Sequence, residues 1–217
     1  MTEDLFPRQP GDPVFREALA DGAWLLRGFA FEEAVTLLIE VDRVLQQAPW
    51  RHMRTPGGLQ MAVAMTNCGP LGWTSDARGY RYESCDPTTG KPWPALPLAF
   101  AALARNAAQA VGFAHFAPDA CLINRYQPGT RLSLHQDRDE RPLDAPIVSV
   151  SLGLSAIFLF GGLQRSAPVR RVQLAHGDVV VWGGRSRLAF HGIAPLAAGH
   201  HALTGSQRIN LTFRQAL

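Results

Sequence analysis

The 217-residue sequence has no apolar run that approaches the roughly 20 residues needed to cross a lipid bilayer. Its first residues are acidic, and no basic segment followed by an apolar stretch appears there, so we expect no secretory signal. Cysteine is scarce as well: the three cysteines show no C-x-x-C spacing, which argues against a disulfide framework or a zinc site and favours reduced thiols. These absences predict a cytoplasmic protein that does not enter a membrane.

Lysine is nearly absent, since Lys91 is the only one among 21 basic residues. The net charge of +3 and the isoelectric point near 9.1 are mildly basic, which is compatible with a polyanionic partner without demonstrating one. With 47% hydrophobic and 18% charged residues, the composition is that of a globular protein and not of a disordered chain. No repeat or linker marks a boundary, so we expect a single domain over 1–217, with 1–22 as an N-terminal extension.

His135 and Asp137, followed far downstream by His191, form the most informative pattern. In an extended segment alternate side chains share a face, so His135 and Asp137 are expected to point the same way while Gln136 points away. Two imidazoles and one carboxylate are the ligand set of the facial triad of non-haem Fe(II) oxygenases. An H-x-D triplet also occurs by chance, as a surface pair or a satisfied core histidine.

A second pattern lies near the C-terminus, where polar and apolar residues alternate from Arg208 to Arg214. One face carries Arg208, Asn210, Thr212 and Arg214, and the other is apolar. This is either an ordinary strand with a solvated polar face or an anion site. Arginine offers planar, paired donors for carboxylates, so two arginines on one face fit a dicarboxylate such as 2-oxoglutarate.

Asn124 and Tyr126 share a face at the end of another expected strand, just before the turn at 127–129. An amide and a phenol there could hydrogen-bond the same cosubstrate. Taken alone, the simpler interpretation is that Tyr126 packs and Asn124 caps the turn.

Apolar spacing predicts two helices, at 31–47 and 96–110. The segment 67–94, rich in glycine, proline and aromatic residues, is expected to be a functional loop, and the start of the chain to about residue 21 to be loosely ordered. Short β-rich runs separated by glycine turns predict a sandwich or barrel packed against helices. The expected strands cover 23–29, 61–65, 119–126, 147–160, 169–174, 178–182 and 206–213.

Together, the Asn124–Tyr126, His135–Asp137, His191–Gly192 and Arg208–Arg214 motifs resemble, in the same order, those of the AlkB family. The likeness extends over nearly the whole chain, from about 23 to 216, and is close to bacterial members. It implies an α+β protein: a double-stranded β-helix, or jelly roll, with flanking helices and an N-terminal nucleotide-recognition lid. The lid region would cover 49–94 and the jelly-roll catalytic core 117–217.

The resemblance also implies a chemistry, that of an Fe(II)- and 2-oxoglutarate-dependent dioxygenase. His135, Asp137 and His191 would bind the iron, with 2-oxoglutarate and O2 as cosubstrates. In the cosubstrate site, Arg208 would hold the distal carboxylate with Tyr126 and Asn210, and Arg214 and Asn124 would serve the metal-proximal end, with Thr212 on the same face. The expected reaction is oxidative demethylation of bases such as N1-methyladenine and N3-methylcytosine, with release of formaldehyde, as in DNA repair.

On the substrate side, the resemblance implicates the aromatic residues Trp73, Tyr80 and Tyr82 of the lid, together with Asp139 and Arg165. Aromatic rings on loops can stack on unpaired bases, although they could equally close the small core of a hairpin. A carboxylate at Asp139 suits a positively charged methylated base, but taken alone, among the charged residues Arg138, Glu140 and Arg141, the simpler interpretation is a solvated turn residue.

The expected partner is single-stranded or locally opened DNA, and RNA as an extension, bound by a monomer. Two other functions remain open on the sequence. One is an oxygenase of the same chemistry that acts on a small metabolite or a protein. The other is a non-catalytic jelly roll that binds nucleic acid, with a structural zinc or no metal.

Overall fold

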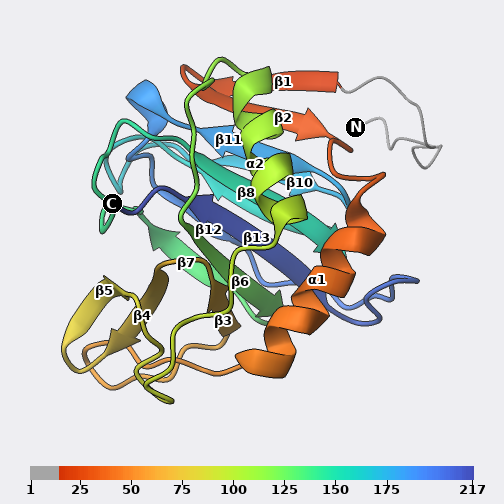
Figure 1. Cartoon of the computed structure of the whole chain (residues 1–217). Coiled ribbons are helices and arrows are strands. Elements are labelled where there is room, and N and C mark those ends of the chain that lie inside the picture. Colours follow the sequence, from red (N-terminus) through yellow and green to blue (C-terminus); the bar gives the residue numbers. More distant parts are fainter. Residues whose placement is uncertain (1–14) are drawn as a thin grey trace.

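The structure, a computed structural model, describes residues 15–217 and contains one large antiparallel sheet (Figure 1). One of its interior strands, β13 (Arg208–Arg214), pairs along its length with β8 and β6, so both of its edges are hydrogen-bonded, and all of its residues are buried. In spatial order the seven strands are β1 (Phe15–Ala20), β2 (Ala23–Arg27), β11 (Val179–Trp182), β8 (Ile147–Gly153), β13, β6 (Ala120–Tyr126) and β3 (Ala64–Cys68).

A second sheet of four strands completes the sandwich. Its order is β10 (Arg170–Leu174), β9 (Ala156–Phe160), β12 (His191–Ile193) and β7 (Leu132–His135). One cluster of buried side chains contains members of both sheets, such as Leu25 and Val180 from the large sheet with Phe158 and Val172 from the small one. Two antiparallel sheets with their apolar faces in contact give the jelly-roll architecture that the sequence predicted.

Two helices, α1 (Ala34–Gln47) and α2 (Leu98–Ala110), lie over the outer face of the large sheet (Figure 1). Their buried side chains join those of β13 in a second core, where Phe100 of α2 meets Phe213 edge-on. The apolar face of β13 therefore packs against the helices, and its polar face turns into the sandwich.

A separate hairpin, β4 (Gly72–Asp76) and β5 (Gly79–Glu83), lies at one end of the molecule (Figure 1). Its two strands pair only with each other, and Trp73, Ser75, Tyr80 and Tyr82 share one face by register. A one-turn 3-10 helix, Gly184–Ser186, precedes β12.

The fold class and both helices were predicted correctly, and several boundaries were not. Residues 15–20, expected to be loosely ordered, form strand β1 paired with β2, while residues 1–14 of the expected extension lie outside the described residues. The predicted strand 147–160 is two strands, because the chain turns at Gly153 (φ +92°). The strand predicted at 61–65 begins only at Ala64, and the expected loop 67–94 contains the hairpin.

Within residues 15–217, no helix combines the length and apolar character required to cross a membrane.

Candidate active site

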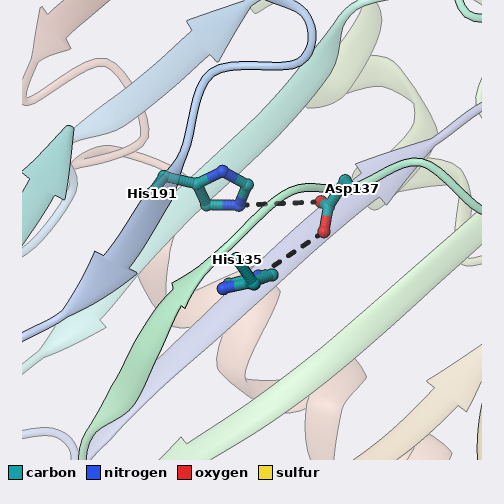
Figure 2. A group of neighbouring side chains, drawn as sticks. All are labelled: His135, Asp137 and His191. Atoms are coloured by element: carbon teal, nitrogen blue, oxygen red, sulfur yellow. Dashed lines mark ion pairs between the residues drawn. The ribbon is translucent and has the colours of Figure 1, made fainter. Parts of the chain in front are cut away.

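His135, Asp137 and His191 converge where β7 ends beside β12, with their side chains turned toward one another (Figure 2). Their ligand atoms all lie within 4.8 Å of one another. Asp137 Oδ1 is 3.5 Å from His135 Nε2, and Asp137 Oδ2 is 3.8 Å from His191 Nε2. Among the described residues no other group of three His, Cys, Asp or Glu side chains meets in this way, so the predicted metal set is confirmed as a cluster.

Backbone carbonyls fix the orientation of both imidazoles. His135 Nδ1 lies 2.9 Å from Ser133 O, and His191 Nδ1 lies 3.0 Å from Ala189 O. A carbonyl can only accept, so each Nδ1 carries the proton and each Nε2 keeps its lone pair on the side of Asp137. This is the arrangement by which proteins prepare histidine to ligate a metal.

The protonation states also suit a cation. Burial lowers the pKa of His191 to about 4, and the neighbouring His135 acts in the same direction, so this imidazole is neutral at neutral pH. Burial alone would raise the pKa of Asp137, but the positive charge of Arg214 holds it well below its usual value. A neutral imidazole beside a carboxylate is the state that binds a metal.

The spacing argument for the pair on one strand was only partly right. His135 is the last residue of β7 and faces His191 of β12 in register, whereas Asp137 lies in the loop that follows. Gln136 does point elsewhere, since its amide donates to Leu188 O at 2.6 Å. Asp137 reaches the cluster because two arginines hold it. Arg214 donates to the Asp137 carboxylate, and Arg187 donates to the Asp137 backbone carbonyl.

A wall of buried polar side chains adjoins the triad. It is built by the predicted residues of β6 and β13, which alternate on facing positions, with Tyr126 opposite Arg208 and Asn124 opposite Asn210. The wall is inside the sandwich, so the alternative of a solvated polar face is excluded. Its members are Asn124, Tyr126, Arg208, Asn210, Thr212 and Arg214, all buried.

Arg208 has an unused donor in this wall. Its guanidinium lies over the ring of Tyr126, 5.0 Å from the centroid, and its Nε donates to Ser151 Oγ at 2.9 Å. One of its terminal nitrogens is buried without any hydrogen-bond partner. A buried cation with an unpaired donor is costly unless an anion completes it, so this atom marks a place for a carboxylate.

The other predicted wall residues are engaged with the protein itself. Asn210 donates to Ser149 Oγ at 2.8 Å and to Val150 O at 2.9 Å, and its own oxygen accepts from Asn124 and Thr212. Arg214 donates to Asp137 Oδ2 through Nε (2.9 Å) and a terminal nitrogen (2.7 Å). The two arginines therefore differ: Arg208 has an unpaired hydrogen-bond donor, whereas Arg214 connects the wall to the metal cluster.

At the rim of the site, the hairpin meets the loop after β7. Trp73 stacks on Tyr80 with ring centroids 5.6 Å apart and planes at 12°, and its Nε1 donates to Asp139 Oδ2 at 3.0 Å. The structure thus brings four of the five predicted substrate residues together: Trp73, Tyr80 and Asp139 in this group, with Tyr82 beside them on the same hairpin face. Arg165 lies apart, in the β9–β10 connection, with its guanidinium over Phe190, the neighbour of His191.

Sequence reasoning missed Glu140, Arg187 and Ser151. Glu140 belongs to a run of charged residues, a pattern typical of a solvated loop, yet it is 2% exposed and bonded to Tyr82 and Arg187. Its neighbours along the chain gave no signal, because its partners come from distant segments. The five histidines outside the triad form no further cluster of three possible metal ligands in the described part of the chain.

Comparison with protein families matches residues 22–214 to the 2OG-Fe(II) oxygenase superfamily. The protein named alpha-ketoglutarate-dependent dioxygenase AlkB from Salmonella typhimurium is 63% identical over 98% of this chain and 97% of its own length. Its namesake from Escherichia coli is 61% identical over 93% and 94%. The chain belongs to the AlkB family of 2OG-Fe(II) oxygenases.

Other AlkB-family proteins extend the comparison. The solved structure of OsALKBH1 superposes with a TM-score of 0.81 at 29% identity and covers 92% of this chain and 99% of that one. A more distant relative from Schizosaccharomyces pombe, 36% identical over 49% of this chain and 39% of its own, is named tRNA demethylase abh1. Relatives are thus named for action on nucleic acid.

The residues present fit the cofactor and cosubstrate of the AlkB family, Fe(II) and 2-oxoglutarate. The triad offers two nitrogen ligands and one oxygen ligand, the set that leaves coordination positions open on iron. The unpaired donor of Arg208 offers a buried cation for a carboxylate, a few residues along β13 from Arg214, which contacts the triad.

Proposed function

We propose that this dioxygenase removes N-methyl groups from nucleobases, such as N1-methyladenine and N3-methylcytosine, in single-stranded or locally opened DNA and in RNA. It acts as a monomer in the cytoplasm. Residues 117–217 form the catalytic core, and 49–94 form the lid over the substrate. The relatives' names, which include dioxygenase and tRNA demethylase, support this class of substrate.

His135, Asp137 and His191 hold Fe(II), which, with 2-oxoglutarate and O2, supplies the oxidation of the N-methyl group. Arg208, assisted by Tyr126 and Asn210, holds the distal carboxylate of the cosubstrate. Asn124, Thr212 and Arg214 line the end nearer the metal. The protein's contribution is to orient these groups and to exclude water from a site whose six predicted wall residues are all buried.

The observation that carries the substrate class is the group at the rim, where an aromatic stack and a carboxylate meet two residues from a metal ligand. A methylated base with a positive charge can pair with Asp139 as the indole N–H of Trp73 does in this structure. Trp73 and Tyr80 offer a flat surface on which a base removed from its helix can stack. Tyr80 and Tyr82 serve as contacts for the base or its flanking phosphate, and Arg165 is a further substrate residue.

Demethylation is tested by reconstituting the protein with Fe(II) and 2-oxoglutarate without oxygen, then adding air and an oligonucleotide that carries N1-methyladenine. We expect succinate and formaldehyde in equal amounts and loss of the methyl group by mass spectrometry. Asp137→Ala should abolish both products because it removes a ligand. Asp144→Ala, an exposed aspartate in the same loop, is the control.

The two other functions give different results in this assay. A binding module would form no succinate from 2-oxoglutarate. An oxygenase of small metabolites or proteins would form succinate slowly but leave the methylated oligonucleotide intact. Full activity of Asp137→Ala would refute the metal assignment itself.

A further inference from the structure

Glu140 is a carboxylate buried beside the active site, and neither the metal nor the cosubstrate accounts for it. Only 2% of it is exposed. Tyr82 Oη donates to its Oε1 at 2.6 Å, Arg187 donates to its Oε2 at 3.0 Å, and Arg214 Nε lies 3.2 Å from Oε1. Both of its oxygens are therefore used, as a buried carboxylate requires.

Two of the three partners of Glu140 continue to the metal ligand Asp137. Arg214 donates to the Asp137 carboxylate, and Arg187 donates to its backbone carbonyl at 2.6 Å. Arg187 is anchored further by Ala145 O, at 2.9 Å. Two guanidinium groups and two carboxylates thus balance in charge within one buried cluster.

The third partner, Tyr82, belongs to the hairpin. It connects β5 to a cluster whose other members lie on β13, in the loop between β7 and β8, and in the segment between the 3-10 helix and β12. The strands of the hairpin pair with no other strand, so individual bonds such as this one and those of Asn67 and Asp139 to Trp73 attach it to the rest of the protein. Glu140 is consequently the branch point at which the position of the hairpin and the orientation of Asp137 meet.

Stability alone is a weak reason for this cluster, because buried ion pairs often contribute little compared with apolar residues of the same size. Orientation is a better reason, since residues behind a metal ligand fix its direction and basicity. We propose that Glu140 is a positioning residue that holds Arg214 against the Asp137 carboxylate and makes that orientation depend, through Tyr82, on the seating of the β4–β5 hairpin. For its substrate readout this inference rests on the proposed function.

The first test needs neither metal nor substrate. Hydrogen exchange is measured by mass spectrometry on the wild type, Glu140→Gln and Tyr82→Phe. Both variants should increase exchange in the hairpin (72–83) and also in the Asp137 loop (136–141). Glu17→Gln, which removes another carboxylate paired with two arginines but on β1, is the matched control and should alter neither segment. If Tyr82→Phe loosens the hairpin alone, the link is overturned.

The second test measures how tightly cosubstrate use is coupled to demethylation, as the ratio of succinate to formaldehyde with a methylated oligonucleotide. Glu140→Gln should raise this ratio about 10-fold, in line with the effect of residues that support metal ligands. Tyr82→Phe should raise it less, and the double variant should not exceed Glu140→Gln, because both changes break one connection. Independent, additive effects, or an unchanged ratio in Glu140→Gln, would contradict the proposal.

These outcomes separate the inference from the proposed function. Wild-type protein that forms succinate but no formaldehyde from methylated oligonucleotides would refute the substrate class and leave the exchange experiment as the test of Glu140. Circular dichroism checks that each variant folds. Should Glu140→Gln fail to fold, Tyr82→Phe still decides the question, since it removes a single oxygen from a partly exposed side chain.

Discussion

Strand β13 and the β4–β5 hairpin both present functional side chains, but the protein holds them in very different ways. All seven residues of β13 are buried, and the strand pairs on both sides. Every residue of β5 is at least partly exposed, and the hairpin is fastened by individual bonds, such as those between Asn67 and the backbone of Trp73. The proposed site for a constant cosubstrate is thus built into the core, whereas the proposed surface for a variable base is a hairpin held by individual bonds.

The largest expected difference between the two regions is in stability. Phe213→Ala removes a fully buried ring that meets Phe100, so it should lower the free energy of unfolding by about 3–5 kcal/mol. Tyr80→Ala, in the hairpin, removes a ring that is 47% exposed and should cost less than about 1 kcal/mol. Urea unfolding of both variants gives their free energies of unfolding. Equal losses of unfolding free energy would mean that the hairpin is part of the cooperative core.

Arg208 tests whether the core site was built for binding at some cost to stability. Arg208→Met should weaken 2-oxoglutarate binding about 10- to 100-fold, because a charge-assisted contact to the carboxylate is lost. The melting temperature of the cosubstrate-free protein should not fall, since the change removes a buried cation with an unpaired donor. Anaerobic titration and a thermal melt give the two values, with the exposed Arg16→Met as control. A large drop in melting temperature would show that Arg208 is mainly structural.

Trp73 gives the reverse test, in the hairpin. Trp73→Ala should raise the KM for methylated oligonucleotide about 10-fold, since stacking on one base contributes about 1–3 kcal/mol. The dissociation constant for 2-oxoglutarate should stay the same, because the hydrogen bonds of Trp73 join it to Asn67 and Asp139 and not to Arg208. Trp73→Phe keeps a ring but loses the N–H that donates to Asp139, so its KM should lie between those of the wild type and Trp73→Ala. A parallel change in cosubstrate affinity would erase the distinction between the regions.

The same contrast explains what the sequence could predict. Alternation along Arg208–Arg214 is a local property, and it correctly placed the polar side chains on one face and the apolar ones on the other. The jelly roll and both helices followed from periodicity and from the family resemblance. Alternation did not reveal that the polar face is buried; that depends on the second sheet, which closes over it.

Glu140 shows where local patterns fail. Within the run Asp137–Arg141 every residue is charged, which is typical of a solvated loop. Its burial is decided by Arg187 and Tyr82, 47 and 58 residues away in the chain. In the same way β7 ends at His135, so Asp137 is placed by arginines from elsewhere and not by strand geometry.

The smallest expected effect is on the pH dependence of the free energy of unfolding, and it should involve the sandwich and not the hairpin. His176 accepts a hydrogen bond from Gly153 N at 2.9 Å, and its ring centroid lies 4.4 Å from that of His201. Burial, with the charge of His201, lowers the pKa of His176 to about 4. The unfolded chain, with an ordinary histidine pKa, therefore binds more protons between about pH 4 and 6.5, so folding stability falls as the pH drops through this window. His176→Gln removes that contribution, and its unfolding free energy should decline less steeply than that of the wild type between pH 7 and 4. The exposed His115→Gln is the control. Because the hairpin is not involved, the KM for oligonucleotide at pH 7 should be the same in His176→Gln and wild type, and a change there would mean that the two regions are joined at this end as well.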